Sequence, residues 1–285
     1  MSAAPEPKHP LLQPLVIARL KGGLGNQIAH YAAARLMSLR FDLPLRLDLS
    51  EFARDLSWRT PRTYALGPFA TIQHSADPDL VRRLTGTLGG RAAGRVHRTM
   101  AQKGFRPRGP VLVTLPWYGE RSAPGAEQLR AELVLTGELS PAAREIARAI
   151  AGAAHPVAVH VRRGDYVGHS RHQLCDEPYF DEAIRYCESR IAEPELFVFS
   201  EDVEWCRERL RFRRARFVQG VGSDAEEFIL MARCRHFILS NSTFSWWALW
   251  LQRDPGVVVA PERWDREATG PSPFLRPGWH VLPVE

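Results

Sequence analysis

Short apolar runs alternate with longer amphipathic stretches along most of this chain. In the first half, the pattern predicts a strand over 15–20, a helix over 26–40 and a strand over 43–49. The pattern is mixed from there to about residue 115. A strand, a glycine cluster and a helix therefore open the chain.

The alternation is more regular in the second half. It begins with a helix over 138–153, for which Ser140 is the expected N-cap and Pro141 lies in the first turn. The expected strands then read VAVHV, LFVFS, RFVQ, HFILS and GVVVA, and the helices between them PYFDEAIRYCESRI, DVEWCRERL, DAEEFILMARC and FSWWALWLQ. Strands that alternate with helices of this length predict a parallel sheet with right-handed crossovers.

Length and composition indicate a globular protein of two domains. The 285 residues contain 45% hydrophobic and 25% charged side chains, which argues against wholesale disorder. We expect a flexible tail over 1–14, an N-terminal domain over 15–150 and a C-terminal domain over 151–285. The tail lacks a signal pattern, and the apolar runs are far shorter than the ~20 residues of a membrane span. We therefore expect a cytoplasmic protein.

Cysteine and charge patterns narrow the chemistry further. Cys175, Cys187, Cys206 and Cys234 form no CxxC pair, so we expect reduced, packing cysteines and not a zinc site or disulfide framework. The net charge of +6 comes almost entirely from arginine, which suits phosphate binding, although a GC-rich genome gives the same excess. The basic segment 91–108 predicts a solvated loop that could contact the inner face of the plasma membrane.

The glycine cluster at the start of the chain resembles a dinucleotide-binding turn but departs from it. Gly22, Gly23 and Gly25 follow the first strand, yet Ile28 stands where the third glycine of GxGxxG belongs. Asp48 does end the next strand, about where the ribose-binding acid would lie.

Two interpretations of this cluster stay open. Backbone N–H groups at the helix start can face an anion, with Asn26, which opens the predicted helix, and Gln27 adding side-chain amides. The other interpretation is a tight strand-to-helix turn without a ligand.

The stretch VAVHVRRGDYV carries the strongest chemical signal. In a strand, His160 and Arg162 share one face, and Arg162, Arg163 and Asp165 come at or after its carboxyl end, where open α/β sheets bind ligands. Two arginines there can neutralise a diphosphate leaving group without a metal. The alternative is a structural Arg–Asp ion pair.

Two further strands deliver polar residues to the same expected edge. After HFILS, Ser242 and Thr243 cap a helix and offer a second anion site, while the tryptophans that follow are expected to pack that helix. After FVFS, Glu201 and Asp202 could hold ribose hydroxyls or a guanine edge, or Asp202 could simply cap the next helix.

Metal-dependent sugar transferases often carry an acidic DxD sequence. The match at Asp77–Asp79 precedes LVRRL as an ordinary helix start with Pro78 in the first turn, so we give it little weight. HExxH, P-loop and GxSxG patterns are absent from the sequence. We therefore expect no metal.

Together, GGLGNQ, HVRRGDY, FVFSEDVEW and LMARCRHFILSNSTFSWWALWL resemble the bacterial α-1,2-fucosyltransferases in order and spacing, from about residue 15 to 264. The resemblance implies a GT-B-like α/β fold, with two Rossmann-like domains whose parallel sheets face an interdomain cleft. GDP-fucose would bind the C-terminal domain, and the N-terminal domain would shape the acceptor site. The implied reaction is inverting, metal-independent transfer of fucose to the 2-hydroxyl of a β-galactoside in a glycan, lipid-linked or free.

The resemblance also implies roles for individual residues. Arg162 would contact the β-phosphate and Asp165 would be the second catalytic residue, with Arg163 supporting their loop and His160 near the nucleoside. The other implied donor-binding residues are Asn26, Asp202, Ser242, Thr243 and Phe244, together with the glycine loop of Gly22, Gly23 and Gly25.

The general base is less well defined. Related enzymes sometimes carry a glutamate shortly after the aspartate of this motif, but here Gly168, His169 and Ser170 follow. Asp165, His169 and Asp176 remain candidates, and a weak base suffices because the hydroxyl loses its proton late.

Three other functions compete with this interpretation. The strand–glycine–helix start fits an NAD-dependent Rossmann enzyme, although the missing glycine argues against it. A pI near 9.4 fits a nucleic-acid-binding protein, but no recognised binding module accompanies the charge. A GT-B glycosyltransferase of another linkage or acceptor is the nearest alternative.

Overall fold

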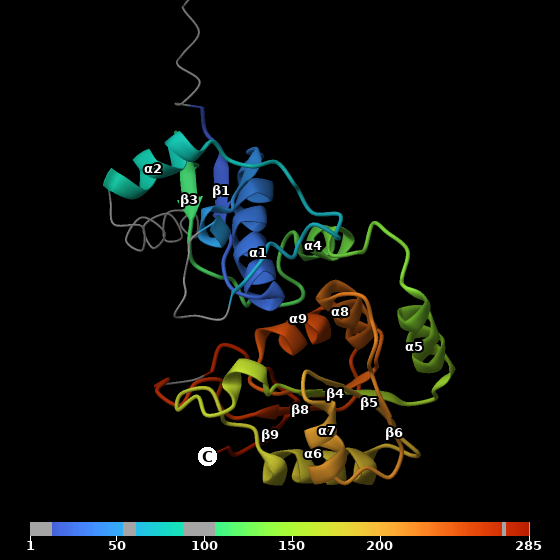
Figure 1. Cartoon of the computed structure of the whole chain (residues 1–285). Helices are drawn as coiled ribbons and strands as arrows, with labels where there is room; N and C mark the ends of the chain where they lie inside the picture. Colours follow the sequence, from blue (N-terminus) through green and yellow to red (C-terminus); the bar gives the residue numbers. More distant parts are fainter. Residues whose placement is uncertain (1–12, 54–60, 88–105, 270–271, 285) are drawn as a thin grey trace, which may run out of the picture. The chain divides into compact units, whose positions relative to one another are not determined.

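The structure is a computed structural model that describes residues 13–53, 61–87, 106–269 and 272–284 (Figure 1). The chain divides into unit 1, Met1–Val134, and unit 2, Leu135–Glu285. Most of the expected N-terminal tail over 1–14, and all but the last residues of the basic segment 91–108, lie outside the described residues.

Unit 1 contains a small parallel sheet between two helices. Its strands β1 (Val16–Arg19), β2 (Leu45–Asp48) and β3 (Val111–Val113) are ordered β2-β1-β3. Helix α1 (Leu24–Phe41) packs on β1, and α2 (Pro78–Thr87) contributes Leu80 and Val81 to a cluster with Ile17 and Leu112 (Figure 1). The remaining elements are η2 (Ser50–Ala53) and α4 (Ala126–Glu132). The expected helix start after Asp77 is confirmed by α2.

Helix α1 begins at Leu24, and not at Asn26 as the sequence predicted. Gly22 adopts φ +75°, a left-handed conformation that turns the chain away from β1, and Gly23 is the N-cap. Asn26 consequently lies within the first helical turn, and Gly25 is buried inside the helix.

Unit 2 contains a six-stranded sheet in which all strands are parallel. The strands are β4 (Pro156–Val161), β5 (Glu195–Ser200), β6 (Ala215–Phe217), β7 (His236–Ile238), β8 (Val258–Pro261) and β9 (His280–Leu282). Their order is β6-β5-β4-β7-β8-β9. The chain therefore runs from β4 outward to β6, then returns to the other side of β4 and runs outward again to β9.

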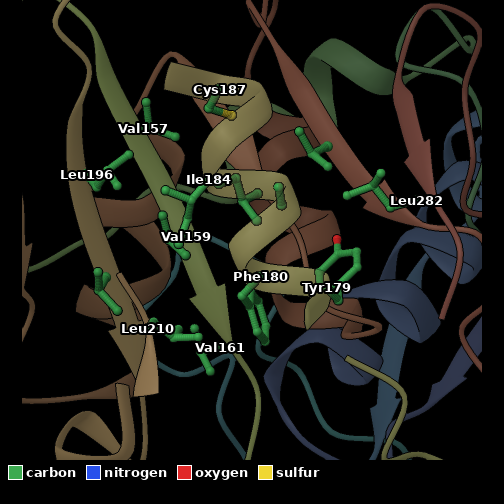
Figure 2. Close-up of a cluster of buried hydrophobic side chains, with 14 of the residues drawn as sticks. Val157, Val159, Val161, Tyr179, Phe180, Ile184, Cys187, Leu196, Leu210 and Leu282 are labelled. Carbon is green, nitrogen blue, oxygen red and sulfur yellow. The ribbon is translucent and has the colours of Figure 1, made fainter. Parts of the chain in front are cut away.

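Helices cover both faces of this sheet. Helices α6 (Glu177–Arg190) and α7 (Val203–Arg209) lie on one face, and α5 (Pro141–Gly152), α8 (Asp224–Ala232) and α9 (Thr243–Leu251) on the other (Figure 1). Figure 2 shows Val157, Val159 and Val161 of β4 beside Phe180 and Ile184 of α6, all fully or almost fully buried. Among the described residues, no helix has both the length and the apolar character needed to cross a bilayer.

The division between the units lies before α5, and not after it near residue 150. The physical reason is that α5 packs against α8. Glu226 of α8 also accepts hydrogen bonds from the backbone N–H and the hydroxyl of Ser140. Ser140 is the N-cap of α5 as predicted, accepting from the N–H of Ala143 at 3.2 Å. Helix α5 therefore belongs to unit 2.

The cysteines and tryptophans of unit 2 pack the core as the sequence predicted. All four cysteines are free thiols, and Cys187, Cys206 and Cys234 are buried. Trp246, Trp247 and Trp250 of α9 are each at most 2% exposed. Burial of these large side chains fixes α9 on the sheet, which holds its N-terminus in place.

A buried polar cluster ties α1 to α4 in unit 1. The carboxylate of Glu132 accepts a hydrogen bond from the Tyr31 hydroxyl at 2.5 Å and pairs with Arg35 at 2.8 Å. The Tyr31 oxygen in turn accepts from the N–H of Ile72 at 3.0 Å. Burial and the bond to Glu132 raise the pKa of Tyr31, so it remains a donor.

We expect Glu132→Ala to lower the free energy of unfolding by about 3 kcal/mol, because it leaves a buried hydroxyl and a guanidinium without their acceptor. Urea denaturation measures the change. Glu127→Ala is the matched control on the same helix: its carboxylate is 62% exposed and pairs with Arg130, so its loss should cost about 0.5 kcal/mol. Equal losses in the two variants would contradict the role given to the buried cluster.

Candidate active site

The carboxyl edge of the unit 2 sheet brings together three of the sequence motifs. Because the strands are parallel, the residues that follow them meet at one edge: Arg162 and Arg163 after β4, Glu201 and Asp202 after β5, and the loop to α9 after β7. Strands β4 and β7 are neighbours, but their onward connections leave in opposite directions. This is the topological switch point at which open α/β sheets bind ligands.

His160 and Ser240 join the two strands at the switch point. The Nδ1 atom of His160 lies 2.8 Å from the Ser240 hydroxyl. The imidazole stacks on the ring of Phe244 of α9, with the two ring centroids 5.6 Å apart. Burial, with a smaller contribution from the charge of Arg162, lowers the pKa of His160 to about 3. The ring is therefore neutral near pH 7, and its Nε2 atom has no hydrogen-bond partner among the described residues.

Arg162 is held by several groups yet remains reachable. Its guanidinium pairs with the carboxylates of Glu201 and Asp165 and lies over the ring of Tyr166, 5.1 Å from the centroid. One fifth of the side chain is exposed. The Arg–Asp ion pair foreseen as the structural alternative is therefore present, and it still leaves part of the guanidinium open to a ligand.

Arg163 and Asp202 form a second pair beside it. The two side chains meet at 2.9 Å, and the guanidinium lies 4.0 Å above the ring of Trp205. Asp202 also caps α7 by accepting from the N–H of Trp205 at 3.1 Å. The hydrogen bond from Arg163 is the main cause of the lowered pKa of Asp202. This carboxylate is ionised and already has two partners.

The N-terminus of α9 provides an electropositive group at the same edge. Ser242 is the N-cap and accepts from the N–H of Phe244 at 3.3 Å, while Thr243 begins the helix. No acidic side chain occupies the first turn of α9. Asn241 is used differently: its amide donates to the carbonyls of His172 at 2.9 Å and Trp264 at 3.1 Å. The helix end is thus suited to an anion.

Glu227 of α8 is a candidate site residue that the sequence reasoning missed. It lines a cavity of about 410 Å³ together with Glu201, Asp202 and Gln219. Burial, followed by repulsion from Asp224, raises the pKa of Glu227 from 4.5 to about 7. One sequence signal could have found it. Leu230 and Met231 follow Glu227 at positions i+3 and i+4, so the helical spacing places the carboxylate on the same face as buried apolar residues.

The three candidate bases all lie in or next to the loop after β4. Asp165, in η3 (Gly164–Tyr166), pairs with Arg162. His169 is exposed, with its Nδ1 atom 3.3 Å from the N–H of Arg171. Asp176 caps α6 by accepting from the N–H of Tyr179 at 3.4 Å. Each group therefore already has a contact that limits its freedom as a base.

In unit 1, the two amides next to the glycine cluster have different environments. Asn26 is exposed, and the φ of +75° at Gly22 favours glycine there; a Cβ on Gly22 would also lie 3.1 Å from the Cβ of Asn26. Gln27, which the sequence offered to an anion, is fully buried. Its amide donates to the carbonyls of Gly22 and Thr63, both at 2.8 Å, so that expectation is wrong.

Asp48 does not have the environment of a ribose-binding acid. Its carboxylate accepts from Arg19 at 2.6 Å and from the N–H of Ser50 at 3.0 Å, and the residue is 4% exposed. The glycine loop and Asp48 thus reproduce the outline of a dinucleotide site without a free acceptor for the ribose.

Known proteins match the chain along most of its length. The sequence profile of glycosyl transferase family 11 matches residues 130–282. An alpha-1,2-colitosyltransferase of Escherichia coli is 30% identical over 278 residues, covering 88% of this chain and 92% of that protein. Galactoside alpha-(1,2)-fucosyltransferase 2 of Rattus norvegicus is 30% identical over 141 residues, covering 45% of this chain and 40% of that protein.

A solved structure shares the fold. The fucosyltransferase NodZ from Bradyrhizobium matches with a TM-score of 0.53 at 15% identity, covering 83% of this chain and 93% of that one. With a helix-flanked parallel sheet in each unit, this likeness confirms the predicted GT-B-like α/β fold. The family profile and the long match to the colitosyltransferase agree with the motifs at the sheet edge. The chain therefore belongs to glycosyl transferase family 11 and is a glycosyltransferase.

Proposed function

We propose that the protein transfers L-fucose from GDP-fucose to the 2-hydroxyl of a β-galactoside in a glycan, with inversion and without a metal. One observation carries the proposal: Arg162 lies at the switch point of the unit 2 sheet, partly exposed, at the edge where α9 begins. The α-1,2 linkage named for the two relatives supports the regiochemistry. A NodZ structure of the same fold was soaked with GDP-fucose, which supports the donor.

In this proposal the diphosphate lies between Arg162 and the N-terminus of α9. Cleavage of the bond between fucose C1 and the β-phosphate oxygen leaves negative charge on GDP. A guanidinium can hold two phosphate oxygens at once, and the N–H groups near Ser242 and Thr243 face the same charge. Donors already in place before the bond breaks stabilise the transition state more than donors that must reorganise.

Asp165 and Glu201 act through Arg162 in this scheme. Their carboxylates fix the guanidinium, so that its direction is set before the donor arrives. The β-phosphate displaces one of these carboxylates from Arg162. One ion pair thus replaces another, and the guanidinium keeps an anionic partner. Asp165 is then a positioning residue and still one of the candidate bases, with His169 and Asp176.

We place guanine in the cavity that Glu227 lines. The Watson–Crick edge of guanine presents N1–H and N2–H donors side by side, and a carboxylate accepts both. His160 does not line this cavity, but it lies at the same sheet edge, and its neutral ring has an Nε2 atom open to hydrogen bonding. Gln219 and the ionised Asp202 add acceptors for ribose hydroxyls.

At the reacting carbon, the acceptor oxygen forms a bond to fucose C1 on the face opposite the departing diphosphate. The 2-hydroxyl gives up its proton late, when the new bond has largely formed. The metal-free part of the proposal is supported by the arginine and helix N–H groups, which are the groups that would neutralise the leaving diphosphate.

We propose a β-galactoside-terminated glycan as acceptor, either free or lipid-linked, and no nucleic acid. The reaction would take place in the cytoplasm, with at most peripheral contact with the inner face of the plasma membrane. Four free cysteines support a reducing compartment.

GDP-colitose is a second candidate donor. The relative that covers 88% of this chain is named a colitosyltransferase, and colitose is fucose without its 3-hydroxyl. A site that hydrogen-bonds this hydroxyl should strongly disfavour colitose, whereas an apolar contact there should discriminate little.

We expect incubation with GDP-fucose and lactose to give a product with fucose on O2 of galactose, identified by NMR linkage analysis. Parallel reactions with GDP-colitose rank the donors by kcat/KM. Activity should persist in excess EDTA. Loss of activity in EDTA that Mn²⁺ or Mg²⁺ restores would contradict the metal-free step, and a different linkage would contradict the assigned regiochemistry.

Arg162→Ala should lower kcat by about 10²–10³-fold, because it removes a donor aimed at the developing charge. Arg162→Lys keeps the charge but loses the paired N–H groups of the guanidinium, so its kcat should lie between those of the wild type and Arg162→Ala. Circular dichroism checks the fold, and Arg144→Ala on α5 is the surface control. Retention of most of kcat by a folded Arg162→Ala protein would overturn the assignment.

GDP binding should strengthen as the pH rises through about 7, because Glu227 accepts guanine N–H groups only as a carboxylate. Glu227→Gln should bind GDP about tenfold more weakly at pH 8. Calorimetric titrations measure the GDP affinity of both proteins from pH 6 to 8. Titration of the GDP phosphate changes the affinity of both, so the difference between the two pH profiles reports on Glu227. Superimposable pH profiles would exclude Glu227 from guanine recognition.

A further inference from the structure

A second cavity in unit 2 has Arg162 in its wall. It measures about 410 Å³ and lies between the loop after β4 and helix α7. Tyr166 and Val167 come from the loop, Trp205 and Arg209 from α7, and Glu177 from the start of α6. A cavity of this volume is large enough for a small-molecule ligand.

The loop wall of this cavity is fixed from outside. Asn241 holds the carbonyl of His172 at 2.9 Å, and Arg266 holds the carbonyls of Ser170 and Gln173 at 2.9 and 3.2 Å. Arg171 pairs with Asp265 at 2.6 Å. A ligand would therefore meet a preformed wall and would not have to order it.

Two opposite charges in this cavity have no partner. Neither Glu177 nor Arg209 forms an ion pair or a side-chain hydrogen bond within the described parts of the chain, and they do not pair with each other. Arg162 and Arg163, in contrast, are both paired with carboxylates. The cavity thus offers one free hydrogen-bond acceptor and one free donor group.

The charges and apolar surfaces together indicate the class of ligand. Arg162 and Arg163 also line this wall, but their carboxylate partners offset their charges. A phosphate deeper in the cavity would therefore meet one unpaired arginine, Arg209, against the carboxylates of Asp176 and Glu177. A neutral ligand rich in hydroxyls can donate to Glu177 and accept from Arg209. Val167, 52% exposed, supplies apolar surface for the C–H groups of a sugar ring.

We propose that this cavity is a saccharide subsite for the acceptor, holding the sugar rings next to the reacting galactose. The inference rests on the proposed function, because Arg162 forms part of the cavity wall and is the residue we place against the β-phosphate. Unit 2 would then select the acceptor as well as bind the donor, and Glu177 and Arg209 would determine specificity for oligosaccharides over a single galactose.

The test compares acceptors of different length. Glu177→Ala and Arg209→Ala should each raise the KM for a galactose-terminated tetrasaccharide five- to tenfold. The KM values for methyl β-galactoside and GDP-fucose should stay within twofold. Glu182→Ala on α6 and Arg211→Ala just after α7 are matched controls: Glu182 pairs with the exposed Arg185, and Arg211 is exposed and lines neither cavity.

Saturation-transfer NMR with the tetrasaccharide and GDP measures binding without turnover. Loss of the saccharide signal in both cavity variants, with calorimetric GDP affinity intact, supports the subsite. The subsite is wrong if wild type and variants give the same signal, if wild type gives none, or if the short and long acceptors are affected equally. Failure of the wild-type protein to bind GDP contradicts the proposed function instead.

Discussion

The parallel direction of all six strands in unit 2 is the constraint on which the site depends. It brings the carboxyl end of every strand to one edge, so residues far apart in sequence meet without a dedicated binding domain. The connections diverge only between β4 and β7, and there the hydrogen bond between His160 and Ser240 joins the two strands. The neutral, buried imidazole spans the switch point at little electrostatic cost, which a charged side chain could not do.

Charge at this edge is balanced and not strongly positive. Arg162 faces two carboxylates and Arg163 faces one, so the arginines attract a diphosphate less than their number suggests. The ion pairs hold the two long arginine side chains in a fixed direction. Less side-chain conformational entropy is therefore lost when a ligand binds. The N-terminus of α9 has no acid in its first turn, so its positive potential is not offset locally. For the diphosphate that we propose as ligand, affinity would then depend more on the helix end, and orientation more on the arginines.

Much of the fold could be predicted because periodicity is a local property. The alternation around VAVHV predicted one strand face for His160 and Arg162, and in the structure His160 stacks on Phe244 of α9 while Val159 packs in the core cluster with α6. The remainder depended on distant partners. Gln27 could not be recognised as internal, because it bonds to residues some 36 positions away, in a stretch with no clear pattern. Strand β9 has only three residues and was missed, since its identity comes from pairing with β8. Glu227 became a candidate site residue only because the segments after β5 and β6 line a cavity with it.

Unit 1 shows why a dinucleotide-like outline need not bind a dinucleotide. The third glycine of that motif allows close packing of the helix on the strand. Here Ile28 takes its place and is fully buried, so the same position adds apolar packing. The acid that would hold a ribose is committed to Arg19, and a ribose that took its place would leave a largely buried guanidinium without its partner. The only polar side chain of the motif left exposed is Asn26. The strand–turn–helix unit has therefore kept its ability to present backbone N–H groups and one amide, while the residues that would recognise NAD have become part of the structural core.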